Sequence, residues 1–132
     1  FAWPNGITTD GTNLYVADSD NNRIRKIVIS TGEVTTLAGS SYGYADGIGS
    51  SAQFYYPDGI TTDGTNLYIA DTVNNRIRKI IIATREVTTL AGSSEGDADG
   101  IGTSAQFAWP NGITTDGTNL YVADNNKIRC IK

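Results

Sequence analysis

Residues 4–27 read PNGITTDGTNLYVADSDNNRIRKI, and this stretch decides the fold because the chain repeats it. A close copy follows at 57–80 and a shortened one at 110–131. Aligning the chain with itself gives one period of 53 residues: 1–53 and 54–106 differ at only 12 positions, and FAWPNGITTDGTNLYVAD is identical at 1–18 and 107–124. Such a period indicates an architecture in which neighbouring units bury each other's apolar faces.

Each unit contains four short strand-like segments, at 5–9, 13–18, 23–29 and 34–38 in the first copy. Asp10-Gly11 and Thr31-Gly32 are turn pairs between them, and the β-favouring Leu, Tyr and Val occupy 14–16. Connections this short predict an antiparallel meander and leave no window for a helix. Four short antiparallel strands form one blade of a β-propeller.

We therefore expect an all-β chain of three propeller blades, at 1–53, 54–106 and 107–132. The third copy reaches Lys132 without its fourth segment, so this blade is expected to lack its outer strand. The connection between its second and third segments is two residues shorter than in the other copies. This deletion places Asn125-Asn126 where a two-residue type I′ turn fits.

Composition excludes several functional classes. The chain has no histidine and one cysteine, which removes a histidine zinc site, a Ser-His or Cys-His pair and an intrachain disulfide. A net charge of −4 argues against nucleic acid as a partner, although Arg23, Arg25 and Lys26 form a basic stripe. The longest apolar run, 80–83, is too short to span a membrane. No phosphate-binding motif is present, so no cofactor is expected.

The motifs P-x-G-I, N-L-Y-[VI]-A-D and N-R-I-R-K-I recur in this order, followed by VTTLAG and DGIGSSAQF. Together they resemble the NHL repeat over the whole chain, with Asn22 and Asn75 in place of the signature histidine. The resemblance implies a β-propeller, often six-bladed, that serves mostly as a rigid platform for binding proteins or RNA. It also implies a secreted or cell-surface location. The histidine-bound metal of a few lyases in the family cannot be carried over to a chain without histidine.

An acidic residue ends the second segment of each copy, and a basic residue begins the third segment across the turn. We predict cross-strand ion pairs with a structural role, which register the two strands. The alternative is a ring of carboxylate ligands or catalytic acids. The predicted pairs are Asp18–Arg23, Asp71–Arg76 and Asp124–Lys127.

The glycine-rich segment between units reads SYGYADGIGSSAQF in one copy and SEGDADGIGTSAQF in the next. Its acidic residues suggest a calcium loop, but only Asp46 and Asp99 recur and the order of the helix-loop-helix calcium site is not met. We therefore expect these aspartates to accept hydrogen bonds from backbone amides of their own loop. The recurring Phe1, Phe54 and Phe107 are expected to wedge between neighbouring blades.

Differences between the copies concentrate in connections that lie on one face of a propeller. This distribution suits ligand binding over a uniform scaffold, and it equally suits sequence drift at tolerant loops. Aromatic residues before the prolines add a surface for sugars or peptides. The candidate ligand-facing residues are Trp3, Asp20, Tyr42, Tyr44, Glu95, Asp97 and Trp109. Cys130 aligns with Lys26 and Lys79, so we expect its thiol to be accessible to solvent.

The sequence thus favours a non-enzymatic propeller module that binds a protein, peptide or glycan and assembles with itself. Head-to-tail assembly of n chains gives rings of 3n blades, and only a six-bladed homodimer falls within the usual range of about 4 to 8 blades. Two alternatives stay open. One is a hydrolase or lyase that uses carboxylates or a metal, and the other is an excised or engineered propeller fragment with no function beyond assembly.

Overall fold

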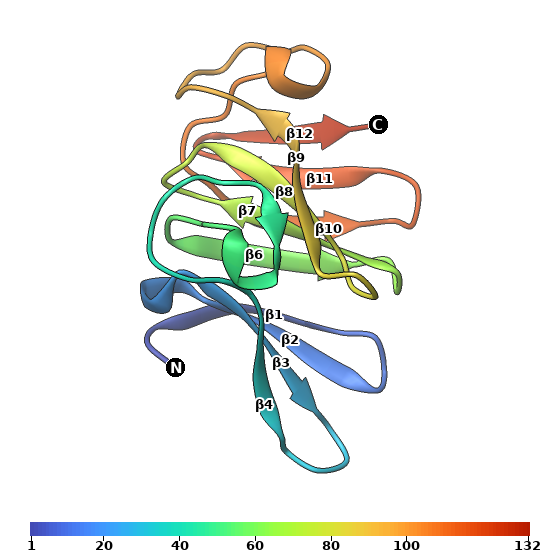
Figure 1. Ribbon diagram of the computed structural model, residues 1–132. Helices are drawn as coiled ribbons and strands as arrows, with labels where there is room; N and C mark the ends of the chain where they lie inside the picture. The colour runs from blue at the N-terminus through green and yellow to red at the C-terminus, as the bar shows by residue number, and fades with distance from the viewer.

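The computed structural model describes all 132 residues, and its regular structure is almost entirely antiparallel β-sheet. The first sheet contains β1 (Pro4–Thr9), β2 (Asn13–Asp18), β3 (Arg23–Val28) and β4 (Val34–Gly39), paired in chain order (Figure 1). The Asp-Gly turn between β1 and β2 is tightened by the Asp10 carboxylate, which accepts hydrogen bonds from the backbone amides of Thr12 and Asn13. The all-β meander predicted from the sequence is confirmed.

The middle sheet repeats this meander with β6 (Pro57–Thr62), β7 (Asn66–Asp71), β8 (Arg76–Ile81) and β9 (Glu86–Gly92). It gains a fifth strand, β5 (Gly47–Ile48), which pairs with β9 at the outer edge. The sequence predicts only a loop at 39–53. A strand forms there because the linker from the first sheet runs alongside the unpaired edge of β9 and satisfies its backbone groups.

The third sheet has three strands, β10 (Pro110–Thr115), β11 (Leu120–Asp124) and β12 (Lys127–Ile131). Asp124 lies opposite Lys127, so Asn125 and Asn126 form the expected two-residue turn. The turn is not of type I′, which needs positive φ at both central residues. Asn125 has a φ of 51°, but Asn126 is not among the residues with positive φ.

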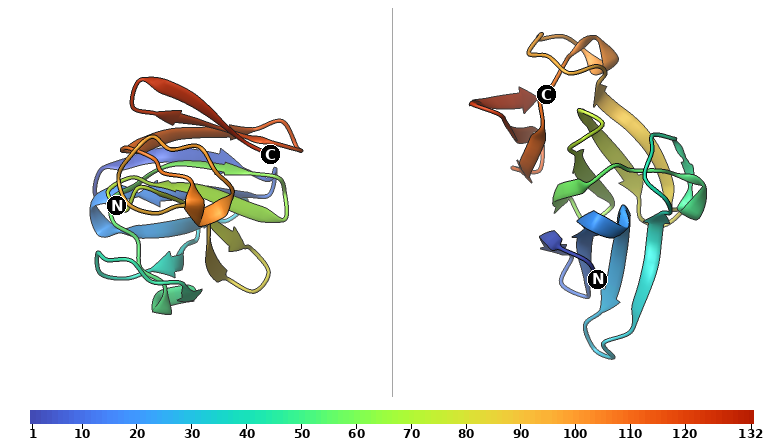
Figure 2. Two further views of the ribbon diagram at one scale, coloured as in Figure 1. Left: turned by 90° about the horizontal axis from the view of Figure 1, so that it is seen from above. Right: turned by 90° about the vertical axis from the view of Figure 1, so that its left-hand side faces the viewer.

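The three sheets stack face to face, with β1, β6 and β10 side by side (Figures 1 and 2). The glycine of P-x-G-I allows this close approach. A Cβ atom on Gly6 would overlap the Asp58 carbonyl oxygen, and one on Gly59 would overlap the Asn111 carbonyl oxygen. At Gly112 the nearest atom to such a Cβ is that of Ala123, at 3.3 Å.

Two apolar cores fill the spaces between the sheets. The core between the first and middle sheets contains Phe54, packed among buried residues of both, and the core between the middle and third sheets contains Phe107 in the same way. The predicted role of these two phenylalanines is confirmed. Phe1 is exposed, because no sheet covers that side of the first sheet.

The helical residues form three single 3₁₀ turns, η1 (Ser19–Asn21), η2 (Gly49–Ser51) and η3 (Gly102–Ser104). None of these turns has the length or the apolar character of a membrane-spanning helix.

Candidate functional site

The β2–β3 and β7–β8 turns lie on the same side of the molecule as the linkers between sheets. The backbone amide of Asp20 donates to the Ala2 carbonyl at 3.0 Å, and that of Val73 donates to the Tyr55 carbonyl at 3.1 Å. The Asn74 side chain donates to the Gly43 carbonyl at 2.8 Å. We call this surface, formed by residues 1–3, 19–22, 40–56, 72–75 and 93–109, the loop face.

Three buried aspartates hold the loop face to the sheets. Asp18, Asp71 and Asp124 end the second strand of each sheet and are almost wholly removed from solvent. Each accepts a hydrogen bond of 2.7–2.8 Å from the backbone amide that follows the recurring phenylalanine, at Ala2, Tyr55 and Ala108 respectively. Burial raises the pKa of Asp71 above its ordinary value, and the charge of Arg78 opposes that rise. These carboxylates fix the path of the segment that leads into each sheet.

The predicted partners of these aspartates are wrong by two residues along the third strand of each sheet. Asp18 and Arg23, Asp71 and Arg76, and Asp124 and Lys127 do lie opposite each other in the sheets. The ion pairs, however, are Asp18–Arg25, Asp71–Arg78 and Asp124–Arg129, at 3.1, 2.8 and 2.8 Å. Side chains two residues apart share one face of a strand, so the second arginine can reach the carboxylate diagonally.

The residues predicted as partners make other contacts. The guanidinium of Arg23 donates to the Asn21 carbonyl, and that of Arg76 donates to the Asn74 carbonyl. Both bonds brace the turn that precedes the strand. Lys127 instead pairs with Asp97 at 2.8 Å, between two exposed side chains.

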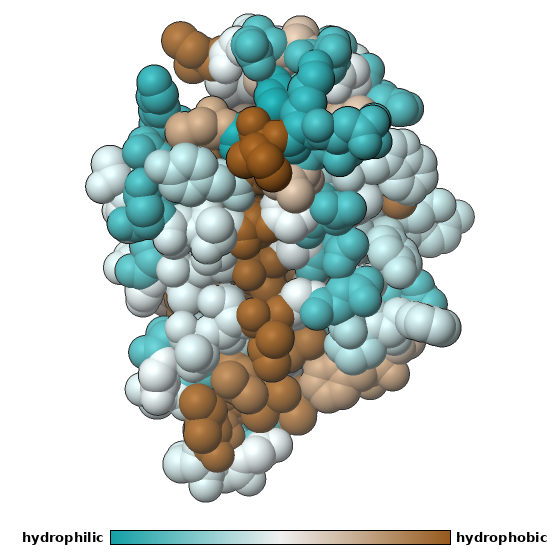
Figure 3. Space-filling model, turned by 180° about the vertical axis from the view of Figure 1, so that it is seen from behind, coloured by the Kyte–Doolittle hydropathy of each residue, from teal (hydrophilic) through white to brown (hydrophobic).

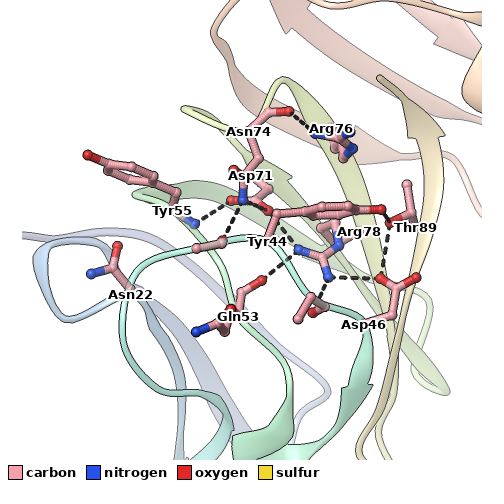
Figure 4. A network of polar contacts seen from close by, with 12 residues as sticks. Asn22, Tyr44, Asp46, Gln53, Tyr55, Asp71, Asn74, Arg76, Arg78 and Thr89 are labelled. Atoms are coloured by element: carbon pink, nitrogen blue, oxygen red, sulfur yellow. Dashed lines mark hydrogen bonds and ion pairs between the residues drawn. The ribbon is translucent and has the colours of Figure 1, made fainter. Parts of the chain in front are cut away.

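Arg78 forms the central polar network of the loop face (Figure 4). Besides Asp71, its guanidinium donates to the Gln53 and Ala45 carbonyls and to the Asp46 carboxylate, at 2.8–2.9 Å. It lies within 5.0 Å of the ring centroids of Tyr44 and Phe54. The side chain has no solvent exposure, and its Nε has no hydrogen-bond partner. Arg78 therefore binds the linker that arrives from the first sheet and joins it to Asp71. We call this set of contacts the arginine clasp.

Arg129 repeats this clasp in the third sheet. It binds Asp124, Asp99 and the carbonyls of Gln106 and Ala98 at 2.8–3.0 Å, and lies over Phe107. Arg25 in the first sheet has only Asp18 and the ring of Phe1 as partners, and its side chain is 22% exposed. The clasp is complete only where a linker from a preceding sheet is present.

The sequence suggests that the recurring loop aspartates accept hydrogen bonds from backbone amides of their own loop. This prediction is wrong. Asp46 accepts from Arg78 and from the Thr89 hydroxyl, while Asp99 accepts from Arg129. The buried arginine of the next sheet is the stronger donor, because it needs charged partners once desolvated. No group of three or more acidic or cysteine residues is arranged to hold a metal ion.

Most of the predicted ligand-facing residues are exposed on the loop face: Trp3, Asp20, Tyr42, Glu95 and Trp109. Tyr42 lies beside Tyr55, with ring centroids 5.1 Å apart. Tyr44 and Asp97 are already engaged. The Tyr44 hydroxyl is 2.7 Å from that of Thr89, its ring lies 3.9 Å from the Arg76 guanidinium, and Asp97 pairs with Lys127.

Sequence reasoning missed two inter-sheet contacts. The Asn22 and Asn75 carboxamide oxygens accept from the backbone amides of Tyr56 and Trp109, which adopt positive φ before proline. The hydroxyls of Ser19 and Thr72 donate to the Pro57 and Pro110 carbonyls at 2.6 and 2.7 Å. Two features of the sequence could have indicated these contacts. Asparagine recurs at the position of Asn22 and Asn75, and the exchange of Ser19 for Thr72 preserves a hydroxyl group.

Stacked antiparallel sheets with a shared loop face define a propeller-like repeat fold. The chain aligns with a structure of a protein of unknown function from Bacteroides thetaiotaomicron, with a TM-score of 0.82 and 31% identity, over 89% of this chain and 32% of that one. It also aligns with an auxiliary nutrient binding protein from the same organism, with a TM-score of 0.80 and 23% identity, over 96% of this chain and 37% of that one. The second likeness shows the fold alone.

The repeat itself has a match. The family model described as NHL repeat matches residues 1–27. Human NHL repeat-containing protein 2 is 34% identical over 96% of this chain, which spans 20% of that protein's length. Residues 1–27 thus match the NHL repeat, and the chain as a whole is similar to an NHL repeat-containing protein, as the sequence motifs indicate.

Proposed function

We propose that this chain is a non-enzymatic propeller module that closes into a six-bladed ring with a second copy and binds a ligand on its loop face. Each sheet then acts as one blade, with units at 1–53, 54–106 and 107–132. The carrying observation is that repeat positions buried at the internal junctions are exposed at the two ends of the stack.

The end formed by the first sheet exposes positions that are otherwise buried. Phe1 is 57% exposed, whereas Phe54 and Phe107 are at most 2% exposed. Ile7 is 60% exposed, whereas its counterpart Ile60 is 6% exposed. On the side opposite the view of Figure 1, a column of apolar surface continues to this end of the molecule (Figure 3).

The end formed by the third sheet shows the complementary pattern. Ile128 is 76% exposed, whereas Ile24 and Ile77 at the same repeat position are fully buried against the following sheet. Fully burying such a side chain is worth about 1.5–3 kcal/mol. The third sheet of one copy and the first sheet of another therefore offer the two halves of a junction that this chain already forms twice.

Head-to-tail contacts either close into a ring or continue as a filament. Two copies supply six blades, which lies within the range of about 4 to 8 found in propellers. The closing junction would have fewer hydrogen bonds than the internal ones. The turn at 125–126 lacks the hydroxyl supplied by Ser19 and Thr72, and no linker reaches Arg25.

The carboxylates of the loop face support a role in binding rather than in catalysis. Asp18, Asp71 and Asp124 are each held by a backbone amide and an arginine, and Asp46 and Asp99 are shared with two of the same arginines. Carboxylates bound in this way serve the scaffold. The exposed aromatic residues Trp3, Tyr42, Tyr55 and Trp109 offer flat apolar surfaces with polar edges, which suit a protein, peptide or glycan.

Charge substitution at each end tests the head-to-tail arrangement. Each closing junction pairs the third sheet of one copy with the first sheet of the other. Ile7→Asp and Ile128→Asp should therefore each abolish the dimer, because either substitution places an aspartate in both junctions. Mixing the two variants should restore a dimer, since one junction can then form from two unmodified faces. Ile48→Asp is the matched control, because Ile48 is 59% exposed but lies in β5, away from both ends. A dimer that survives either end substitution contradicts the proposal.

A further inference from the structure

A groove of about 780 Å³ runs along the edge of β12. One wall is β12 itself, from Lys127 onward, and the other is the linker around Asp99, Gly100 and Ile101. Its floor is apolar and is formed by Ala91, Ala105 and Phe107. Ile101 is 93% exposed, although its counterpart Ile48 in the middle sheet forms part of a strand.

The middle sheet shows what occupies the equivalent space. There β9 lies between β8 and β5, so that both walls are hydrogen-bonded to one strand. Gly47 and Ile48, the counterparts of Gly100 and Ile101, pair with Val87 and Glu86. The opposite wall pairs in the same way, with Lys79 opposite Thr88 and Arg78 opposite Thr89.

We infer that the groove binds one extended peptide segment with the pattern of β9, Glu-Val-Thr-Thr-Leu-Ala-Gly, added antiparallel to β12. The segment must come from outside residues 1–132, because β4 and β9, which carry this pattern here, are already paired with β3 and β8. Strand addition would satisfy the free backbone groups of the β12 edge. The inference does not require the ring, since the segment binds to the edge of β12 and to the linker, although Ile128 of the proposed junction also lines the groove.

The walls of the groove specify the side chains of the segment. Its valine would reach the apolar floor, because Val87 shares a buried cluster with Ala38, Ala52 and Phe54, the counterparts of the three floor residues. Its second threonine would donate to Asp99, as Thr89 donates to Asp46 at 3.0 Å.

The β12 wall also fixes the register. The glutamate would lie opposite Lys132, which stands at the position of Ile81, itself paired with Glu86. The isoleucine–glutamate pair of the middle sheet would thus become a pair of opposite charges, lysine and glutamate. The first threonine would lie opposite Cys130, which stands at the position of Lys79. Cys130 is exposed, as expected from the sequence, and it lines the groove.

Disulfide exchange at Cys130 tests the segment and its register together. Two peptides of sequence REVTTLAGSS carry cysteine in place of the first or the second threonine, each as a mixed disulfide with 2-thiopyridone. The Cys130 thiolate attacks the peptide sulfur, the protein–peptide disulfide forms, and 2-thiopyridone leaves and is measured by its absorbance. Directly opposite residues bring their Cβ atoms within reach of a disulfide.

We expect the peptide with cysteine at the first threonine to react at least tenfold faster than the second-threonine peptide and a scrambled peptide. In denaturant all three should react alike. Asp99→Ala should reduce the preference, whereas Glu33→Ala, a change at an exposed residue of the first sheet, should not. Equal rates for the three peptides with the folded chain would overturn the inference. So would rapid formation of a Cys130–Cys130 disulfide between two copies, which would show that β12 pairs with itself.

Discussion

Arg78 Nη1 lies 2.8 Å from Asp71 Oδ2, and neither side chain is exposed to solvent. The corresponding pair in the first sheet, Arg25 and Asp18, is 3.1 Å apart, and the arginine is partly exposed. The same two residue types thus form a buried clasp where a linker crosses them and a simpler ion pair where none does. Residues at the same position of the repeat therefore need not contribute equally to the stability of the fold.

Arg78→Ala should lower the free energy of unfolding by about 3–5 kcal/mol, because it leaves Asp71 buried without its charged partner. Arg25→Ala should cost less, about 1.5 kcal/mol, because Arg25 is partly exposed and its removal lets water reach and hydrate Asp18. Urea unfolding of the two variants measures the difference, and Arg78→Lys provides a milder change if Arg78→Ala does not fold. Equal losses at the two positions would show that the linker contacts add no stability.

Arg85→Gly should stabilise the chain by about 1 kcal/mol, because Arg85 has a φ of 63°, in the left-handed region that disfavours side chains. The first repeat has Gly32 at the same turn, with a φ of 74°. Gly32→Ala is the matched control and should destabilise the chain by a similar amount. Thermal unfolding of both variants checks this pair, and a less stable Arg85→Gly variant would mean that its side-chain contacts outweigh the backbone strain.

Acid should destabilise the chain through its Asp-Gly turns. The amide of Asn13 donates to Asp10, and that of Asn119 to Asp116, and these bonds hold the pKa of each carboxyl at about 2. Because the ordinary value is about 3.9, this stability is present above that pH and is lost as the pH falls toward 2.

The double variant Asp10→Asn with Asp116→Asn should therefore show a flatter dependence of unfolding free energy on pH between about 4 and 2. Urea unfolding at a series of pH values measures the slope, and the values at pH 7 separate any loss of the turn itself. A slope as steep as that of the unmodified chain would place the acid-sensitive groups elsewhere.

Two glycines at the same repeat position should behave differently. Gly59→Ala should lower stability by about 1–3 kcal/mol, because the new methyl group overlaps the Asn111 carbonyl oxygen. Gly112→Ala meets only the Ala123 side chain within the chain, so the isolated chain should keep its stability. In the proposed ring the new methyl group would meet Asn5 of the next copy and weaken the dimer.

Urea unfolding and molar mass in solution distinguish these two effects. A Gly112→Ala variant that remains fully dimeric would show that nothing packs closely against β10 from the outside. A Gly59→Ala variant as stable as the unmodified chain would mean that the middle and third sheets can separate without cost.

The strand pattern was predictable because its signals are local: turn pairs such as Asp10-Gly11 and β-favouring runs such as 14–16 repeat in every unit. The burial of Phe54 and Phe107 followed from recurrence at the 53-residue period. Strand β5 was not predictable, since its two residues carry no strand pattern and form a strand only because the edge of β9 lies beside them.

The ion pairs show a second reason why the structure could not be predicted fully from the sequence. The sequence places Arg23 opposite Asp18, and the structure agrees, but the choice between Arg23 and Arg25 depends on where the buried carboxylate points. That direction is set by the amide of Ala2, in the segment that leads into β1, a contact between residues 16 apart in the sequence. Alignment of the repeats could have suggested a shared role for Arg25, Arg78 and Arg129, but not their partners.

Sedimentation equilibrium is the most direct test of the proposed ring, because it measures mass without assuming shape. The chain has a mass of 14.1 kDa, and the account predicts a single species of twice that mass over a wide range of concentration. A single species at the mass of one chain or of three chains would contradict the two-chain ring. A mass that keeps rising with concentration would also contradict it, because head-to-tail contacts that fail to close form filaments.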